Sequence, residues 1–180
     1  MGTIVFLILI TLAATGIFGQ GNINNSSGTK NEKEIVDEKN QYQSFKDMIE
    51  NRDFVLEADY LRDGRGNRVF VSNTINFVAI DSTTVIIQVG SNSRIGPNGV
   101  GGVTAKGNIT SWKLTEDPKN ESFNLFATVM KPIGIYDLQF SISASGYSTA
   151  LLTGLTMGEL TFEGNVEPYT DSSVYEGSSL

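Results

Sequence analysis

The chain has 180 residues, a net charge of −7, and neither histidine nor cysteine. These absences exclude Ser–His and Cys–His catalytic pairs, disulfides, and zinc sites built from His or Cys ligands. The acidic balance opposes nucleic acid or an anionic lipid surface as a partner, because both are bound through clustered Lys and Arg. We therefore expect a protein that is not an enzyme and that holds no metal or other cofactor.

The chain begins with an apolar run, Thr3 to Phe18, that contains no charged residue. A membrane-spanning helix needs about 20 apolar residues, so this shorter run predicts a signal peptide over residues 1–20, cleaved near Gly19 or Gln20. No Lys or Arg precedes the run, which leaves an uncleaved N-terminal anchor as the alternative. We expect export to the periplasm or cell envelope, with no membrane span after cleavage.

Residues 21–33 are rich in Asn, Ser and Gly and predict a disordered polar spacer. An amphipathic helix is predicted over residues 34–50, because apolar side chains recur at helical spacing on one face. That face consists of Ile35, Tyr42, Phe45 and Ile49, with Met48 beside them. Such a face predicts a helix that packs on the core and ends at Asn51.

From Phe54 the apolar period changes to two, which is typical of strands with one buried face. The extended runs cover 54–60, 68–79, 85–89, 109–114, 123–129, 136–143, 149–153 and 159–163. Turn sequences at 63–67 and 117–120 separate neighbouring runs, and short connections favour antiparallel pairing. We expect a mainly β fold in which an antiparallel meander of about eight strands curls into a sandwich or a barrel. The single β domain would span residues 34–167, followed by a flexible tail over 168–180.

Short motifs in a fixed order mark a family resemblance. In chain order they are Phe54 to Ala58, Gly107 to Trp112, Tyr136 to Leu138, Ser145-Gly146 and Leu160 to Gly164. With these motifs the chain resembles a family of exported Bacteroidetes proteins, the domain of unknown function 4251, over about residues 45–166. The resemblance implies export from a Gram-negative cell and a mostly β fold, with no assigned activity. Members are often lipoproteins, but this chain has no cysteine to carry the lipid.

Two polar segments resemble ligand loops. The glycine-rich loop from Gly96 to Gly102 lacks the Lys-Ser/Thr of a phosphate-binding loop, so we interpret it as a strand connection. Its residues Asn98, Gly99 and Val100 are candidates for contact with a partner. Asp63, Arg65 and Asn67 have the alternate spacing of calcium ligands, but a central cation and a missing downstream glutamate favour a hairpin turn.

Carboxylates are the acid–base groups available to this chain. Glu57 and Asp59 are two residues apart on one predicted strand, and Glu159 and Glu163 lie on another. A carboxylate-only hydrolase would use two facing carboxylates in a cleft, one of them with a raised pKa. Alternating polar residues are also what a solvent-facing strand surface requires, and we favour that interpretation.

Four aromatic residues on the predicted strands are candidates for ligand binding: Trp112, Phe126, Tyr136 and Phe140. They could instead fill the core of the domain. The leading functional hypothesis is a binding or structural module that meets an unknown protein, which predicts an exposed aromatic patch or an open strand edge. The alternative is a carrier of a small apolar ligand, which predicts an apolar cavity lined by these aromatic residues.

Overall fold

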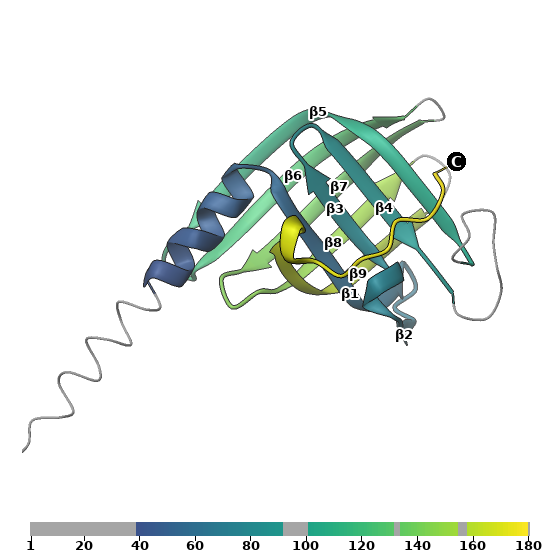
Figure 1. Cartoon of the computed structure of the whole chain (residues 1–180), viewed down its shortest axis with the longest axis horizontal. Coiled ribbons are helices and arrows are strands. Elements are labelled where there is room, and N and C mark those ends of the chain that lie inside the picture. Colours follow the sequence, from purple (N-terminus) through teal and green to yellow (C-terminus); the bar gives the residue numbers. More distant parts are fainter. Residues whose placement is uncertain (1–38, 92–100, 132–133, 155–157, 180) are drawn as a thin grey trace, which may run out of the picture.

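The computed structural model describes residues 39–91, 101–131, 134–154 and 158–179. In these residues a helix runs through 39–50 and nine strands follow it (Figure 1). The strands are β1 (Asp53–Asp63), β2 (Arg68–Phe70), β3 (Phe77–Asp81), β4 (Thr84–Val89), β5 (Val103–Asp117), β6 (Ser122–Lys131), β7 (Gly134–Ser143), β8 (Tyr147–Gly154) and β9 (Gly158–Pro168). Two 3-10 turns, η1 (Asn73–Ile75) and η2 (Tyr169–Asp171), complete the described elements.

Eight of the strands close into an antiparallel barrel. From β3 to β9 each strand pairs with the next, and β1 pairs with both β3 and β9. The pairing of β1 with β9 joins positions as far apart as Phe54 and Pro168 and removes the open edges that a sheet of this size would otherwise expose. The predicted mainly β fold is confirmed. Of the two predicted alternatives, a sandwich and a barrel, the structure shows the barrel.

One edge of β1 is shared between two short strands. The C-terminal part of β1 pairs with β2, with Tyr60 opposite Phe70, and the N-terminal part pairs with β3, with Glu57 opposite Phe77. The sequence predicts one extended run over 68–79, and this prediction is wrong. The 3-10 turn η1 interrupts the run and moves the chain from one half of β1 to the other. Residue alternation does not reveal this step, because both strands contain apolar residues.

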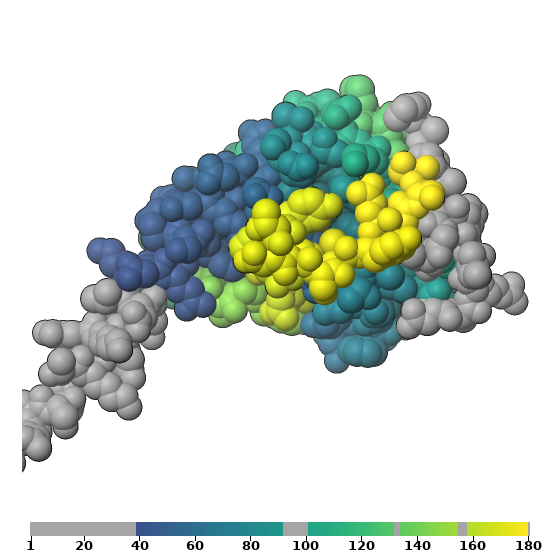
Figure 2. All heavy atoms as spheres, in the orientation of Figure 1, coloured from purple at the N-terminus to yellow at the C-terminus, as the bar shows by residue number. Residues whose placement is uncertain are grey.

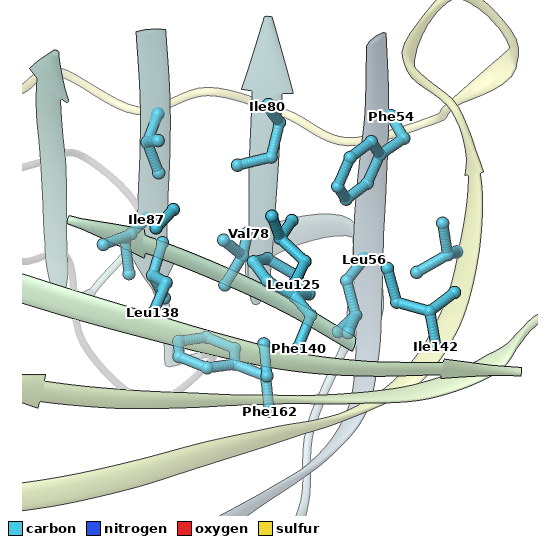
Figure 3. Packing of buried hydrophobic residues seen from close by; sticks show 14 of the residues in the cluster. Phe54, Leu56, Val78, Ile80, Ile87, Leu125, Leu138, Phe140, Ile142 and Phe162 are labelled. Atoms are coloured by element: carbon cyan, nitrogen blue, oxygen red, sulfur yellow. The ribbon is translucent and has the colours of Figure 1, made fainter. Parts of the chain in front are cut away.

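The barrel interior is filled by side chains that alternate along the strands. Phe54, Phe140 and Phe162 are fully buried, and the rings of Phe54 and Phe140 meet edge to face at 5.7 Å. Figure 3 shows side chains from β1, β3 and β4 meeting those from β6, β7 and β9 across the interior. These side chains form one contiguous buried cluster, so the interior is a packed core. Burying each large apolar side chain contributes about 1.5–3 kcal/mol to stability.

The helix packs at one end of the barrel, as its apolar face predicts. Met48 and Ile49 are buried, and the ring of Tyr42 stacks on Phe123 at 5.4 Å. The Tyr42 hydroxyl donates a hydrogen bond to Glu116 at 2.7 Å, and Lys46 bonds the other oxygen of the same carboxylate at 2.6 Å. The first residues of the predicted helix, 34–38, lie outside the described residues, as do the predicted signal peptide and spacer.

The C-terminal segment, residues 169–179, covers part of the outer barrel surface. Tyr169 and Val174 pack on a second apolar cluster, on the outer face of β1, β3 and β4. This cluster consists of Val55, Phe77, Ala79 and Ile86. In Figure 2 the segment, in yellow, crosses the front of the molecule over the teal strands. The sequence predicts a flexible tail over 168–180, whereas residues 168–179 follow a defined course along the barrel.

Buried polar side chains hold this segment in place. Gln88 is fully buried and donates to the carbonyl of Tyr175 at 2.7 Å, while its side-chain oxygen accepts from the backbone amide of Gly177 at 2.7 Å. The Tyr175 amide donates to the carbonyl of Thr74 at 2.8 Å. A glutamine inside an apolar strand is costly unless its polar atoms are paired. The C-terminal segment supplies two of its partners, and the carbonyl of Ile75 and the hydroxyl of Thr104 supply the others.

Candidate binding site

Among the described strands, β2 has the most exposed large apolar side chains. Phe70 is 75% exposed and Val69 is 55% exposed. The ring of Phe70 meets the ring of Tyr60 on β1 edge to face, with 5.5 Å between the ring centres. The guanidinium of Arg68 lies over the Tyr60 ring, 3.4 Å from its centre. Phe70 is therefore held in place by its neighbours while most of its surface faces solvent. We interpret this exposed ring, held in place beside Tyr60, as part of a candidate contact surface.

A hollow of about 670 Å³ adjoins Phe70. Its described lining includes the apolar residues Phe70, Val71 and Ile75, together with polar residues from β1, η1 and the end of β4. These polar residues are Asp59, Ser72, Asn73, Asn76 and Ser91. Ligand sites in proteins typically have volumes of about 300–1,000 Å³ and combine apolar walls with a few polar groups. This hollow has both properties.

A β-bulge contributes Asp59 to the hollow. The pairing of β1 with β9 shifts register between Ala58 and Tyr60, which leaves Asp59 without an opposite residue. Its carbonyl accepts a hydrogen bond from the amide of Val71 at 2.9 Å, so the bulge also fixes the end of β2. Bulges redirect side chains and often lie beside functional sites. The sequence predicts that Glu57 and Asp59 share a strand face, and the bulge separates them.

The floor of the hollow is held by a buried asparagine. Asn76 is 1% exposed; its side-chain amide donates to the carbonyl of Ser72 and its side-chain oxygen accepts from the amide of Gly90, both at 2.9 Å. A Cβ atom at Gly90 would lie 2.8 Å from the carbonyl of Ile75, so a side chain here would displace η1. The hollow is therefore formed by a fixed scaffold before any partner arrives.

An open strand edge lies next to this hollow. β2 pairs with β1 on one side, and no other strand in the described part of the chain pairs with its second side. Unpaired strand edges attract extended segments of other chains. We call the combination of β2, its exposed Val69 and Phe70, and the adjoining hollow the β2 site.

One carboxylate holds two arginines, Arg68 on β2 and Arg62 on the neighbouring β1. Arg62 and Arg68 each donate through Nε to a different oxygen of Glu163 at 2.8 Å. Burial alone would raise the pKa of Glu163, but the two arginine hydrogen bonds outweigh it and keep that pKa below its ordinary value. Glu163 is thus an anchor for two cations, which does not suit it to proton transfer.

The four aromatic residues predicted to bind a ligand lie in different environments. Phe140 is fully buried, whereas Trp112 and Tyr136 are partly buried against the core. Phe126 lies on the outer face and is 40% exposed. The alternation of β6 contains the signal for this difference, since Phe123 and Leu125 point inward and Phe126 must point outward. The predicted loop contacts Asn98, Gly99 and Val100 lie outside the described residues.

Among the described residues, Glu57 and Glu167 form a pair of facing carboxylates, which the C-terminal segment covers. Burial, a hydrogen bond with Glu57 and the charges of Glu57 and Asp171 raise the pKa of Glu167 to about 7. Glu57 is 8% exposed and accepts hydrogen bonds from the Ser172 hydroxyl at 2.9 Å and the Ser173 amide at 3.2 Å. A hydrolase needs its carboxylates open to a substrate, so this geometry does not favour hydrolysis.

Sequence reasoning missed the β2 site. The available signal was the pair of adjacent apolar residues, Val69 and Phe70, since one of two neighbours on a strand must face away from the interior. Among the described residues, no group of three or more His, Cys, Asp or Glu side chains is placed to hold a metal ion. No helix in the described ranges is long and apolar enough to cross a membrane.

Comparison with models of known protein families shows which family the chain belongs to. The model of the family described as domain of unknown function (DUF4251) matches residues 36–166. The chain belongs to this family. The resemblance predicted from the sequence motifs is therefore confirmed, over a slightly longer range.

A solved DUF4251 structure supports the same fold. The crystal structure of a DUF4251 family protein from Bacteroides eggerthii DSM 20697 is similar, with a TM-score of 0.61 and 24% sequence identity. The similarity covers 73% of this chain and 90% of that one. A search of curated proteins gave no match. The family has no assigned function, so function has to be argued from the surface of the barrel.

Proposed function

We propose that this DUF4251 protein is exported to the periplasm or cell envelope and acts there as a non-enzymatic binding module. The observation that supports this proposal most directly is the β2 site, where Phe70 is 75% exposed beside a hollow of about 670 Å³. The partner is a protein segment whose apolar side chain enters the hollow while its backbone lies along the free edge of β2. Strand addition of this kind draws affinity from backbone hydrogen bonds and specificity from side-chain pockets.

The carrier alternative receives less support from the same structure. The barrel interior is filled by large side chains such as Phe54, Phe140 and Phe162, which are fully buried. An apolar carrier would need a cavity among these residues. The described hollow near Phe70 is open to solvent and has a mixed polar and apolar lining, which suits a peptide segment better than a small apolar molecule.

Site-specific photocrosslinking in cells tests the binding proposal. A photoreactive phenylalanine analogue at position 70 of the full chain is expected to give a discrete crosslinked product. The same analogue at position 135 is the matched control, because Ile135 is also an exposed apolar residue, at 46%, and is not part of the hollow's described lining. Equal products at both positions, or no product at position 70, would overturn a binding role for the β2 site.

A separate experiment tests export. The apolar run from Thr3 to Phe18 is the supporting feature. Replacing Leu9 and Leu12 with arginine interrupts the run and is expected to leave the protein in the cytoplasmic fraction, while Asn25→Arg in the spacer leaves its location unchanged. Cytoplasmic location of the unaltered chain would refute export without affecting the argument about the β2 site.

A further inference from the structure

A second hollow lies on a different part of the barrel surface, across the outer face of β6, β7, β8 and β9 and the end of β1. Its volume is about 330 Å³. Core residues such as Leu125, Leu138 and Ala150 point inward from these strands, so the residues between them point outward. We call this hollow the outer groove; its polar lining includes Asn124, Gln139, Ser141, Thr149 and Thr161.

Strand register aligns these residues in two neighbouring rows. In one row Asn124 lies opposite Ser141, which lies opposite Thr149. In the other row Gln139 lies opposite Leu151, which lies opposite Thr161, which lies opposite Arg62. Neighbouring strands are about 4.8 Å apart, so five strands give the groove a length of about 19 Å. This length suits a short chain of linked units better than a single small molecule.

Within the described residues, the amide and hydroxyl groups of the groove are left free for a ligand. The side chains of Asn124, Gln139, Ser141, Thr149 and Thr161 form no hydrogen bond with any residue in the described part of the chain. Some polar residues elsewhere on the surface do have internal partners. Asn67 and Asn120 donate their amides to Asp63 and Asp117, and Thr128 donates to Asp137. The groove brings five polar side chains without internal partners onto one surface.

The charge of the groove is close to balanced. Arg62 and Glu159 are the charged residues in its described lining, and Arg62 is already paired with Glu163 at 2.8 Å. A nucleic acid or another polyanion would need several free cations here. The groove also lies on a sheet face, where the backbone groups of these strands are already paired, so strand addition is not available. Recognition has to use neutral side chains.

An aromatic ring borders these polar residues. Phe126 is directly opposite Gln139 in the pairing of β6 with β7 and is 40% exposed. Opposite residues on one face have Cβ atoms about 4.5–5.5 Å apart, which is within side-chain contact. A ring at the edge of a row of amides and hydroxyls matches a ligand that has hydroxyl groups and an apolar C–H face.

We propose that the outer groove binds a neutral oligosaccharide. The amides and hydroxyls exchange hydrogen bonds with sugar hydroxyls, and Phe126 packs against the C–H face of one sugar ring. Arg62, which Glu163 holds in place, forms the end of the groove at β1 and donates its remaining N–H groups to the same ligand. The groove and the β2 site have different lining residues, although Glu163 anchors both Arg62 of the groove and Arg68 of β2.

Titration of the isotope-labelled full chain with neutral hexasaccharides of glucose, mannose, galactose and xylose tests the proposal by NMR. Polygalacturonate and an extended uncharged decapeptide serve as comparison ligands. We expect at least one neutral hexasaccharide to shift the side-chain amide signals of Asn124 and Gln139. The double variant Asn124→Ala, Gln139→Ala is expected to weaken that binding at least tenfold.

The control variant is Asn108→Ala, which removes an exposed strand amide that lies outside the groove. Unchanged saccharide binding in this variant supports the assignment, and equal weakening overturns it. The proposal is also overturned if no neutral hexasaccharide shifts the groove signals, or if the decapeptide or polygalacturonate shifts them more strongly than every neutral sugar.

Discussion

The carboxyl pair beneath the C-terminal segment makes the stability of this protein depend on pH near neutrality. Glu167 lies on β9 beside Glu57 of β1, and its pKa is raised from 4.5 to about 7. A raised pKa means that the folded state holds the proton more tightly than the unfolded chain does. The associated stability is fully present below about pH 4.5 and is lost as the pH rises to about 7. Replacing Glu167 with glutamine removes this dependence and leaves an uncharged side chain beside Glu57.

The size of the effect follows from the shift. One pKa unit corresponds to about 1.4 kcal/mol, so a rise from 4.5 to about 7 gives at most about 3.4 kcal/mol. Glu167 is partly exposed, and solvent screens its interaction with Glu57. We therefore expect the wild-type protein to lose about 1–2 kcal/mol of unfolding free energy between pH 5 and pH 8 from this pair.

Urea unfolding of the wild type and Glu167→Gln at pH 5, 6, 7 and 8 measures the effect. The variant is expected to be about 1–2 kcal/mol more stable than the wild type at pH 8, with a smaller difference at pH 5. Glu159→Gln, at an exposed position on the same strand, is the control and should follow the wild-type curve. Parallel curves for the wild type and Glu167→Gln would refute the reasoning. Carboxylates whose pKa is lowered, such as Glu163, change the unfolding free energy only at pH values below this range.

Three further predictions follow from the packing. Phe140→Ala leaves a cavity in the core and should cost about 3–5 kcal/mol in urea unfolding; a loss below 1 kcal/mol would contradict the packed interior. Gln88→Ala removes four hydrogen bonds, to residues 75, 104, 175 and 177, and should speed amide hydrogen exchange in the C-terminal segment while leaving β7 protected. Gly164→Ala places a Cβ atom against the carbonyl of Glu57 and should prevent folding, as measured by circular dichroism. The control variant Gly64→Ala should fold, because its Cβ atom meets only the side chain of Glu159. A folded Gly164→Ala variant would contradict the close approach of β1 and β9.

The sequence by itself determined the local elements. Alternation at Phe123, Leu125, Ala127 and Val129 was sufficient to predict β6 and its inward face, since the two sides of a strand face different environments. The same reasoning predicted the helix from Tyr42, Phe45 and Ile49, and the antiparallel order from short connections. Turn chemistry was also local: Asp63 accepts hydrogen bonds from the amides of Arg65 and Asn67 within its own loop.

Only the tertiary structure decided how these elements combine. Closure of the barrel depends on β1 meeting β9, and alternation shows which side of a strand is buried without showing which strand lies beside it. The polar C-terminal sequence gave no sign of its course, because its partners Gln88 and Glu57 lie far away in the chain. The β2 site and the outer groove likewise consist of residues from several strands, so they exist only after long-range pairing has placed those strands together.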